Sequence, residues 1–266
     1  MRIVDASWYL PGSGRDPAAE YRAGHIPGAV FFDIDALSDR QSPLPHMLPP
    51  AADFAAGMAA LGLNDSDTLV IYDGSGVNLS AARVWWTFRT FGHAKVAVLD
   101  GGMGKWRAEQ RPVEQGTVTL ARGNFTARLD ARAVRDLDAV RSNVVSGSEQ
   151  LVDVRSRGRF DGLDPEPRPG LRGGHVPGSI NLPFTELVNS DGTLLPREAL
   201  RRKLTDAGLD LHRPVIATCG SGTSACALIL GLQSIGHSQT SVYDGAWAEW
   251  GARSDTPVEA HSPPDD

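Results

Sequence analysis

Cysteine is scarce in this chain of 266 residues, and several other features are missing too. Two cysteines without a CxxC pair exclude a disulfide framework and a cysteine-based zinc site. The seven histidines are scattered without HxxxH or HExxH spacing, and no glycine-rich dinucleotide fingerprint occurs, so we expect neither a metal nor a cofactor.

Basic blocks and long apolar runs are also absent. The net charge is −6, which argues against nucleic acid as the natural partner. No uncharged apolar run is long enough to cross a bilayer, and Asp5 interrupts the short apolar start, so we expect no membrane association and no signal peptide. The composition favours the reducing cytoplasm.

An internal repeat organises what is present. LVIYDGSG at 69–76 matches PVIATCGSG at 214–222, and HIPGAVFFDI at 25–34 matches HVPGSINLPF at 175–184. FGHAKVAVLDGGMGKW at 91–106 matches IGHSQTSVYDGAWAEW at 235–250, at an offset of 144 positions. So long a period indicates a duplicated domain and not a solenoid.

Strands alternate with helices in each copy, which predicts an α/β fold with a parallel sheet and helices on both faces. The first copy should have strands at 3–6, 30–33, 68–72 and 96–100, a loop up to residue 23, and helices at 52–61 and 80–91. We expect domains at 1–111 and 129–256, a polar linker at 112–128 and a disordered tail at 257–266. A helix at 131–145 should open the second copy.

One stretch carries the chemistry, residues 214–236. An apolar strand at 214–218 ends at Cys219, small residues follow, and a helix at 225–235 closes at Gly236. Glycines let backbone N–H groups curl into an anion-binding concavity, and a helix N-terminus there favours the thiolate. The alternative is an inert core cysteine. Asp73 stands at the Cys219 position in the first copy, which should therefore be an inactive scaffold forming one wall of a cleft.

The motifs together resemble one family. CGSGTSA at 219–225, the HIPG and HVPG turns, RVWW at 83–86, GRFDGLDPEPRPG at 158–170 and YDGAWAEWGA at 243–252 resemble the tandem-domain rhodanese family, most closely its 3-mercaptopyruvate sulfurtransferases. The resemblance runs from Asp5 to about Val258. It implies two rhodanese-like domains, the first inactive. The mercaptopyruvate-type loop usually reads CGSGVTA, so Thr223 and Ser224 are a departure that we expect to tune the loop.

The resemblance also implies an activity. Cys219 would take a sulfane sulfur from 3-mercaptopyruvate as a persulfide and release pyruvate. A thiol or cyanide would accept the sulfur, with thioredoxin among the candidates. The loop residues Gly220, Gly222, Thr223 and Ser224 would bind the substrate.

Two arginines match the family's carboxylate-binding positions. Planar guanidinium groups of Arg159 and Arg168 suit a carboxylate, although pairing with Asp161, Asp164 or Glu166 is the structural alternative. Thiosulfate-specific members carry basic residues directly after the cysteine, where this chain has Gly220 and Ser221. The neutral loop favours a monocarboxylate thiol.

A proton relay is implied by the same resemblance. Ser221, His25 and Asp16 would protonate the enolate left when the C–S bond breaks. The alternatives are that His25 only caps its turn, as His175 does in the second copy, and that Asp5 or Glu20 takes the place of Asp16.

The remaining candidates have structural or supporting interpretations. We expect second-layer or steering roles for Arg155 and Arg172, a cleft-lining or structural role for His46, and core packing for Cys226 and the tryptophans, with Trp247 and Asp244 near the loop. Position 225 is Ala225, where a cysteine-based phosphatase would need an arginine. The other functions to weigh are a thiosulfate sulfurtransferase, a non-catalytic rhodanese-like binding module and a redox sensor.

Overall fold

The computed structural model describes residues 1–10 and 12–260, so the predicted tail lies outside the described residues from 261 onward. The chain forms two compact units. The first contains Met1–Asp130 and Val188–Leu194, and the second contains Ala131–Leu187 and the described residues from Leu195 onward. The predicted duplication therefore appears as two separate bodies.

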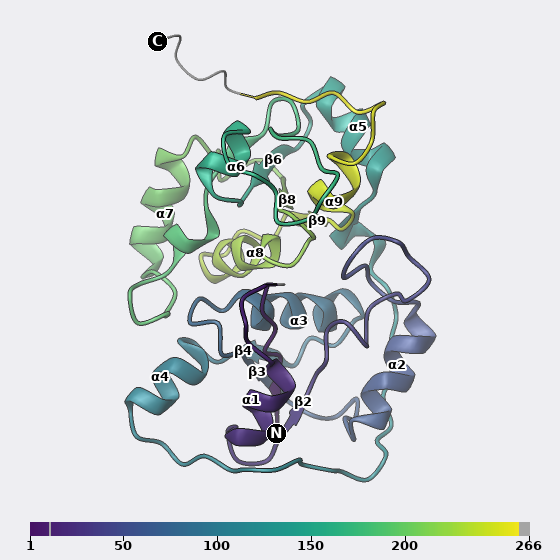
Figure 1. Cartoon of the computed structure of the whole chain (residues 1–266), viewed down its shortest axis with the longest axis vertical. Coiled ribbons are helices and arrows are strands. Elements are labelled where there is room, and N and C mark those ends of the chain that lie inside the picture. The colour runs from purple at the N-terminus through teal and green to yellow at the C-terminus, as the bar shows by residue number, and fades with distance from the viewer. Residues whose placement is uncertain (11, 261–266) are drawn as a thin grey trace. The chain divides into compact units, whose positions relative to one another are not determined.

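The first unit is built on a four-stranded parallel sheet of order β2-β1-β3-β4. Helices gather around these strands (Figure 1). Buried apolar side chains, Phe54, Phe88 and Ile71 among them, form its core. Its elements are β1 (Arg2–Asp5), α1 (Pro17–Ala23), β2 (Ala29–Phe31), α2 (Ala51–Ala60), β3 (Leu69–Tyr72), α3 (Leu79–Thr90), β4 (Val96–Val98) and α4 (Gly102–Ala108).

Two short helices in this unit were not expected from the sequence. The segment before residue 23 was predicted as loop, but α1 begins there because Asp16 is extended and accepts a hydrogen bond from the Ala19 N–H, while Pro17 occupies the first helical turn. Helix α4 follows Gly101, which has a positive φ of 83°. Each of these helices has seven residues, which is too short for a recognisable apolar period.

The predicted linker at 112–128 belongs to the first unit and is not a free connection. Glu114 pairs with His25 in an antiparallel bridge. Phe125 is buried and packs edge-on against Phe54 and Phe88. The boundary between the units lies between Asp130 and Ala131. The polar composition of this segment reflects its exposed side, while a single aromatic residue anchors it.

The second unit has a five-stranded parallel sheet of order β5-β9-β8-β6-β7. Figure 1 shows α5 and α9 on one side of the strands and α7 and α8 on the other. Its elements are η1 (Ala131–Ala133), β5 (Val134–Arg135), α5 (Leu137–Ser146), β6 (Gln150–Asp153), α6 (Arg157–Asp161), β7 (Ile180–Asn181), η2 (Phe184–Leu187), α7 (Arg197–Asp206), β8 (Val215–Thr218), α8 (Ala225–Ser234), β9 (Thr240–Tyr243) and α9 (Ala246–Trp250).

The helix predicted at 131–145 is wrong at its start. Val134 and Arg135 form β5 and pair with Val242 and Tyr243 of β9. The helix begins at Leu137, because Asp136 is extended and its carboxylate accepts from the Ala139 N–H. Sheet pairing therefore overrides the apolar period at the front of this segment.

The end of the second unit extends past the predicted boundary at residue 256. Val258 packs against a buried cluster that includes Ile216 and Trp250. The Trp250 Nε1–H donates to the carbonyl of Pro257, and the Glu259 N–H donates to the carbonyl of His175. Residues 257–260 are therefore part of the fold, and the predicted disordered tail is wrong for them. Within the described residues, no helix is long and apolar enough to cross a membrane.

Candidate active site

Cys219 stands directly after β8, a strand flanked by β9 and β6 in the second unit's sheet. Parallel strands present their carboxyl ends at one edge, where ligands bind in open α/β sheets. The cysteine is only 1% exposed and is a free thiol. The predicted position of the candidate nucleophile at a strand end is confirmed.

The loop after Cys219 is held from outside by α9. The Trp247 N–H donates to the carbonyl of Cys219 and the Ala248 N–H to the carbonyl of Gly220, each at 2.9 Å. In a trans peptide the N–H points opposite to the carbonyl, so the N–H groups of Gly220 and Ser221 face away from α9. This direction is compatible with the predicted anion-binding concavity, which stays a prediction.

Helix α8 closes the loop on its other side. It begins at Ala225, ten residues long, after Gly222 has turned the chain with a φ of 75°. Cys226 is fully buried in this helix, and its thiol donates to the carbonyl of Gly222 at 3.4 Å. Cys226 therefore packs and supports the loop, as expected for a core thiol.

The equivalent loop of the first unit holds a carboxylate. Asp73 is 1% exposed and accepts five hydrogen bonds, from the N–H and hydroxyl of Ser75, the N–H and hydroxyl of Ser80, and the N–H of Ala81. Their lengths run from 2.6 to 3.2 Å. The first unit's loop is thus an anion cradle filled by its own side chain.

The residues that donate to Asp73 in the first unit have counterparts in the second. Ser75, Ser80 and Ala81 correspond to Ser221, Ser224 and Ala225 in the repeat. The Met103 N–H also donates to the Asp73 carbonyl, just as Trp247 does for Cys219. The second loop is two residues shorter between these serines, and a cysteine replaces the aspartate before it. By analogy with the first unit, we expect its N–H groups to hold an anionic sulfur species built on Cys219.

Arg159 lies beside this loop. A Cβ placed on Gly220 would come within 2.9 Å of its Nη2, so the absent side chain at Gly220 is what makes room for the guanidinium. The same guanidinium is paired with Glu166, whose Oε1 lies 3.2 Å from Arg159 Nε and whose Oε2 accepts from Nη2. The arginine is near the loop, as the binding hypothesis needs, and it also makes the carboxylate pair named as the alternative.

Arg155 forms the buried end of the same network. It bonds Asp153 through Nε and Nη2, donates from Nη1 to Glu166 at 2.6 Å, and lies 4.5 Å from the ring centroid of Trp247. Burial opposes its charge, but Asp153 and Glu166 raise the pKa of Arg155 above its ordinary value. The arginine is therefore a fixed cation under the loop, which agrees with a supporting role rather than steering.

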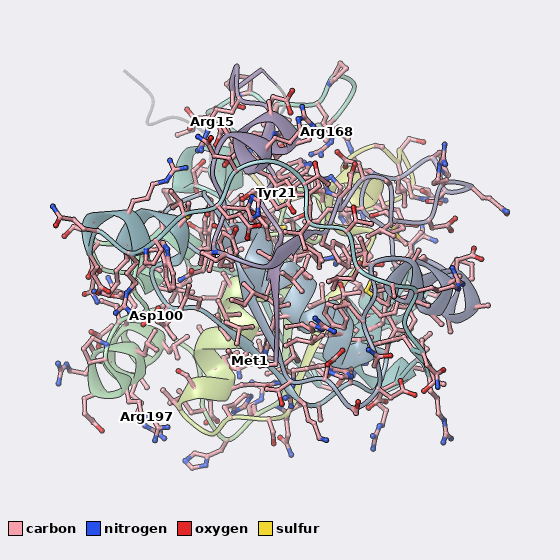
Figure 2. All side chains as sticks on the ribbon, turned by 90° about the horizontal axis from the view of Figure 1, so that it is seen from below. Met1, Arg15, Tyr21, Asp100, Arg168 and Arg197 are labelled. Carbon is pink, nitrogen blue, oxygen red and sulfur yellow. The ribbon has the colours of Figure 1, made fainter. Side chains whose placement is uncertain are left out.

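Arg168 follows α6 in the sequence, and Figure 2 marks its position. It lines an open hollow together with Gly162, Asp164 and Glu166. The hollow shares Glu166 with the network of Arg159, so both predicted binding arginines lie close to one buried carboxylate. Their role in binding a substrate stays a prediction.

His25 and Asp16 belong to the first unit, whereas Ser221 belongs to the second. His25 is completely buried, its Nδ1 donates to the carbonyl of Tyr21 at 2.9 Å, and its ring stacks on that of Tyr21. His175 repeats this arrangement with Phe160. These contacts favour the turn-capping alternative, and the relay stays a prediction.

The acidic candidates for the relay also make local contacts. Asp16 caps α1. Glu20 pairs with Arg15, an exposed residue that precedes α1 and is labelled in Figure 2. Asp5 is buried at the end of β1 and accepts from the Ser7 N–H. Each of the three carboxylates therefore has a structural role within the first unit.

Two other predicted residues have structural roles. Arg172 donates to the carbonyls of Trp250, Gly251 and Thr256, so it ties the end of α9 to the following chain, which matches a supporting role. His46 is buried, packs edge-on against Trp8 and lies 3.1 Å from Asp35, which matches its structural interpretation.

Sequence reasoning missed the importance of Glu166 and Asp153. From the sequence, Glu166 is only a competing partner of the arginines, and Asp153 does not stand out. A signal existed for Asp153, because it follows an apolar strand at the position that Asp5 has in the first copy. Nothing in the sequence indicates that Glu166 is buried.

Known proteins match this chain over nearly its whole length. The model of the rhodanese-like domain matches residues 3–109 and 136–253. Thiosulfate/3-mercaptopyruvate sulfurtransferase 1 of Arabidopsis thaliana is 43% identical over 98% of this chain and 74% of its own length. The 3-mercaptopyruvate sulfurtransferase of Escherichia coli strain K12 is 45% identical over 97% of this chain and 92% of its own.

A solved structure agrees with these matches. The crystal structure of SseA from Escherichia coli, described with the rhodanese fold of 3-mercaptopyruvate sulfotransferases, superposes with a TM-score of 0.85 at 42% identity and covers 92% of each chain. Both sheets and the repeat of the present chain agree with that fold. The chain belongs to the rhodanese family and consists of two rhodanese-like domains.

Proposed function

We propose that this protein is a sulfurtransferase that moves a sulfane sulfur from 3-mercaptopyruvate through a Cys219 persulfide to a thiol or cyanide. One observation carries the proposal. The loop of the first unit cradles the Asp73 carboxylate, and the corresponding, shorter loop of the second unit begins with Cys219 in place of the aspartate. Relatives named 3-mercaptopyruvate sulfurtransferase, about 45% identical over nearly the whole chain, support the same reaction.

The first step is attack by the Cys219 thiolate on the donor sulfur. The S–S bond forms as the C–S bond of mercaptopyruvate breaks, and the bonding electron pair stays on carbon as the enolate of pyruvate. A proton then converts the enolate to pyruvate. The loop N–H groups stabilise the sulfur anion on the enzyme, because they are oriented before the reaction begins.

The second step regenerates the Cys219 thiolate. An acceptor thiolate attacks the outer sulfur of the persulfide, which leaves as part of the acceptor persulfide while the Cys219 thiolate is restored. A small thiol, thioredoxin and cyanide all supply a suitable nucleophile. We place the enzyme in the reducing cytoplasm, where free thiols persist, and cell fractionation tests that location.

Arg159 and Arg168 supply guanidinium N–H groups for the donor carboxylate. Losing a bidentate charged contact costs about 2–3 kcal/mol, so Arg168→Ala should lower kcat/KM for mercaptopyruvate by roughly 30- to 150-fold. Arg197→Ala is the matched control, because Arg197 is an exposed arginine at the start of α7, far from Arg168 in Figure 2. Equal kcat/KM in the two variants would contradict the binding role of Arg168.

A donor panel decides between mercaptopyruvate and thiosulfate. The loop has neutral Gly220 and Ser221, so the monocarboxylate thiol should have the higher kcat/KM. Thiosulfate is the second candidate, because the Arabidopsis relative is named for both donors. A kcat/KM for thiosulfate equal to that for mercaptopyruvate would reduce the proposal to a sulfurtransferase of unresolved donor.

A further inference from the structure

Four charged side chains alternate in sign beneath the Cys219 loop: Asp153, Arg155, Glu166 and Arg159. Each contacts the next, from the Asp153–Arg155 pair through the Arg155–Glu166 contact to the Glu166–Arg159 pair. Two are anions and two are cations, so their charges cancel. The chain of contacts ends at the guanidinium that lies beside Gly220.

Glu166 is the member that joins the buried end to the loop. Its side chain is 3% exposed, whereas the side chain of Arg159 is 20% exposed. Oε1 accepts from Arg155 Nη1 at 2.6 Å and from Arg159 Nε at 3.2 Å, and Oε2 accepts from Arg159 Nη2. With both oxygens engaged, the carboxylate is held in place and cannot turn toward water.

The fixed negative charge of Glu166 changes the electrostatic attraction between a sulfur donor and Arg159 beside the loop. A dianion such as thiosulfate gains more than a monoanion from a bare arginine, because its interaction scales with its charge. When a buried carboxylate pairs with that arginine, the additional electrostatic attraction of the dianion is lost. Nη1 of Arg159 does not contact Glu166, so its N–H groups can still donate directed hydrogen bonds to a monocarboxylate.

We infer that Glu166 sets the preference for monoanionic over dianionic sulfur donors by cancelling the charge of Arg159 beside the loop. The inference rests on the proposed function and adds a specificity-determining residue to it. Glu166 acts through Arg159, so it is a positioning residue and makes no contact with the reacting sulfur.

Glu166→Gln tests the inference with cyanide as acceptor and mercaptopyruvate and thiosulfate as donors. The substitution keeps the shape and an acceptor for Arg155, and removes one charge. The ratio of kcat/KM for thiosulfate to that for mercaptopyruvate should rise about tenfold, as expected for one charge acting on one further donor charge at close range. An unchanged ratio in a folded variant overturns the inference.

Two control variants separate charge from structure. Glu166→Asp keeps the charge and should leave the donor ratio within about twofold of the wild-type value. Glu186→Gln removes a charge from an exposed glutamate paired with Lys203 in the same unit, and should leave the ratio unchanged. A rise of the ratio in Glu186→Gln equal to that in Glu166→Gln would show a general charge effect and overturn the inference.

The wild-type protein provides a second measurement if Glu166→Gln does not fold. A compensated Arg159 predicts that kcat/KM for thiosulfate changes by less than about twofold between low and physiological ionic strength. A steep fall with salt, as for a dianion meeting an uncompensated cation, contradicts the inference. Failure of both donors to place sulfur on Cys219 refutes the proposed function instead, so the two failures are distinguishable.

Discussion

Replacing Asp73 by alanine tests the comparison between the two loops. The carboxylate is buried and receives three backbone N–H groups and two hydroxyls. Without it the hydroxyls of Ser75 and Ser80 can rotate to other partners, but the three N–H groups lose their acceptor. Buried unsatisfied donors cost about 1–3 kcal/mol each, partly offset because a carboxylate no longer has to be buried, so the first unit should lose about 3–5 kcal/mol.

Hydrogen exchange of amides in β1 and β3 measures this loss within the first unit, because a protein of two units need not unfold in one step. Asp16→Ala is the matched control. Asp16 is exposed and caps α1 through one N–H, that of Ala19, so its loss should cost about 1 kcal/mol. A loss for Asp73→Ala no larger than for Asp16→Ala would refute the anion-cradle interpretation of the loop.

The other predictions concern packing, geometry and pH. Cys226→Ala should lower stability by about 1–2 kcal/mol and leave turnover unchanged, measured by thermal unfolding and steady-state kinetics; lost turnover in a folded variant would contradict a packing role. Gly220→Ala should displace Arg159 and lower kcat/KM for mercaptopyruvate by about tenfold with little loss of stability, since only a flexible side-chain end must move; unchanged kinetics would contradict this. Burial lowers the pKa of His93 below its ordinary value of 6.5, so the unfolded chain binds the proton first and stability should fall as the pH drops below about 6.5. His93→Phe should flatten this pH dependence in thermal unfolding, and an unaltered slope would contradict the assignment.

The sequence predicted much of the fold because the apolar strands and the longer helices have clear periods. Strand β8 and helix α8 lie within a residue of their predicted bounds. Short elements escaped detection: α1 carries a signal in Asp16 followed by Pro17, and β5 exists only because a neighbouring strand pairs with it. Sheet pairing is a long-range interaction, and a local pattern cannot contain it.

The sequence predicts those site residues whose type the chemistry requires. It predicts less well those whose role depends on tertiary contacts. Cys219 and its small-residue loop are visible in the sequence, as is the first copy's Asp73. The sequence cannot decide whether Arg159 faces a ligand or Glu166, because the answer depends on how the segment after α6 folds back on the loop. The structure shows that Arg159 contacts Glu166 and lies beside Gly220.

Single-turnover mass spectrometry of Cys219 tests the central claim most directly. Protein mixed with one equivalent of mercaptopyruvate, without an acceptor, should gain one sulfur atom on the peptide that contains Cys219 and none on Cys226, and should release one pyruvate for each sulfur gained. Cys219→Ser should show neither the sulfur nor the pyruvate while keeping its fold, because its hydroxyl is not ionised. Pyruvate release without sulfur on Cys219, or sulfur found on Cys226 instead, would contradict the account.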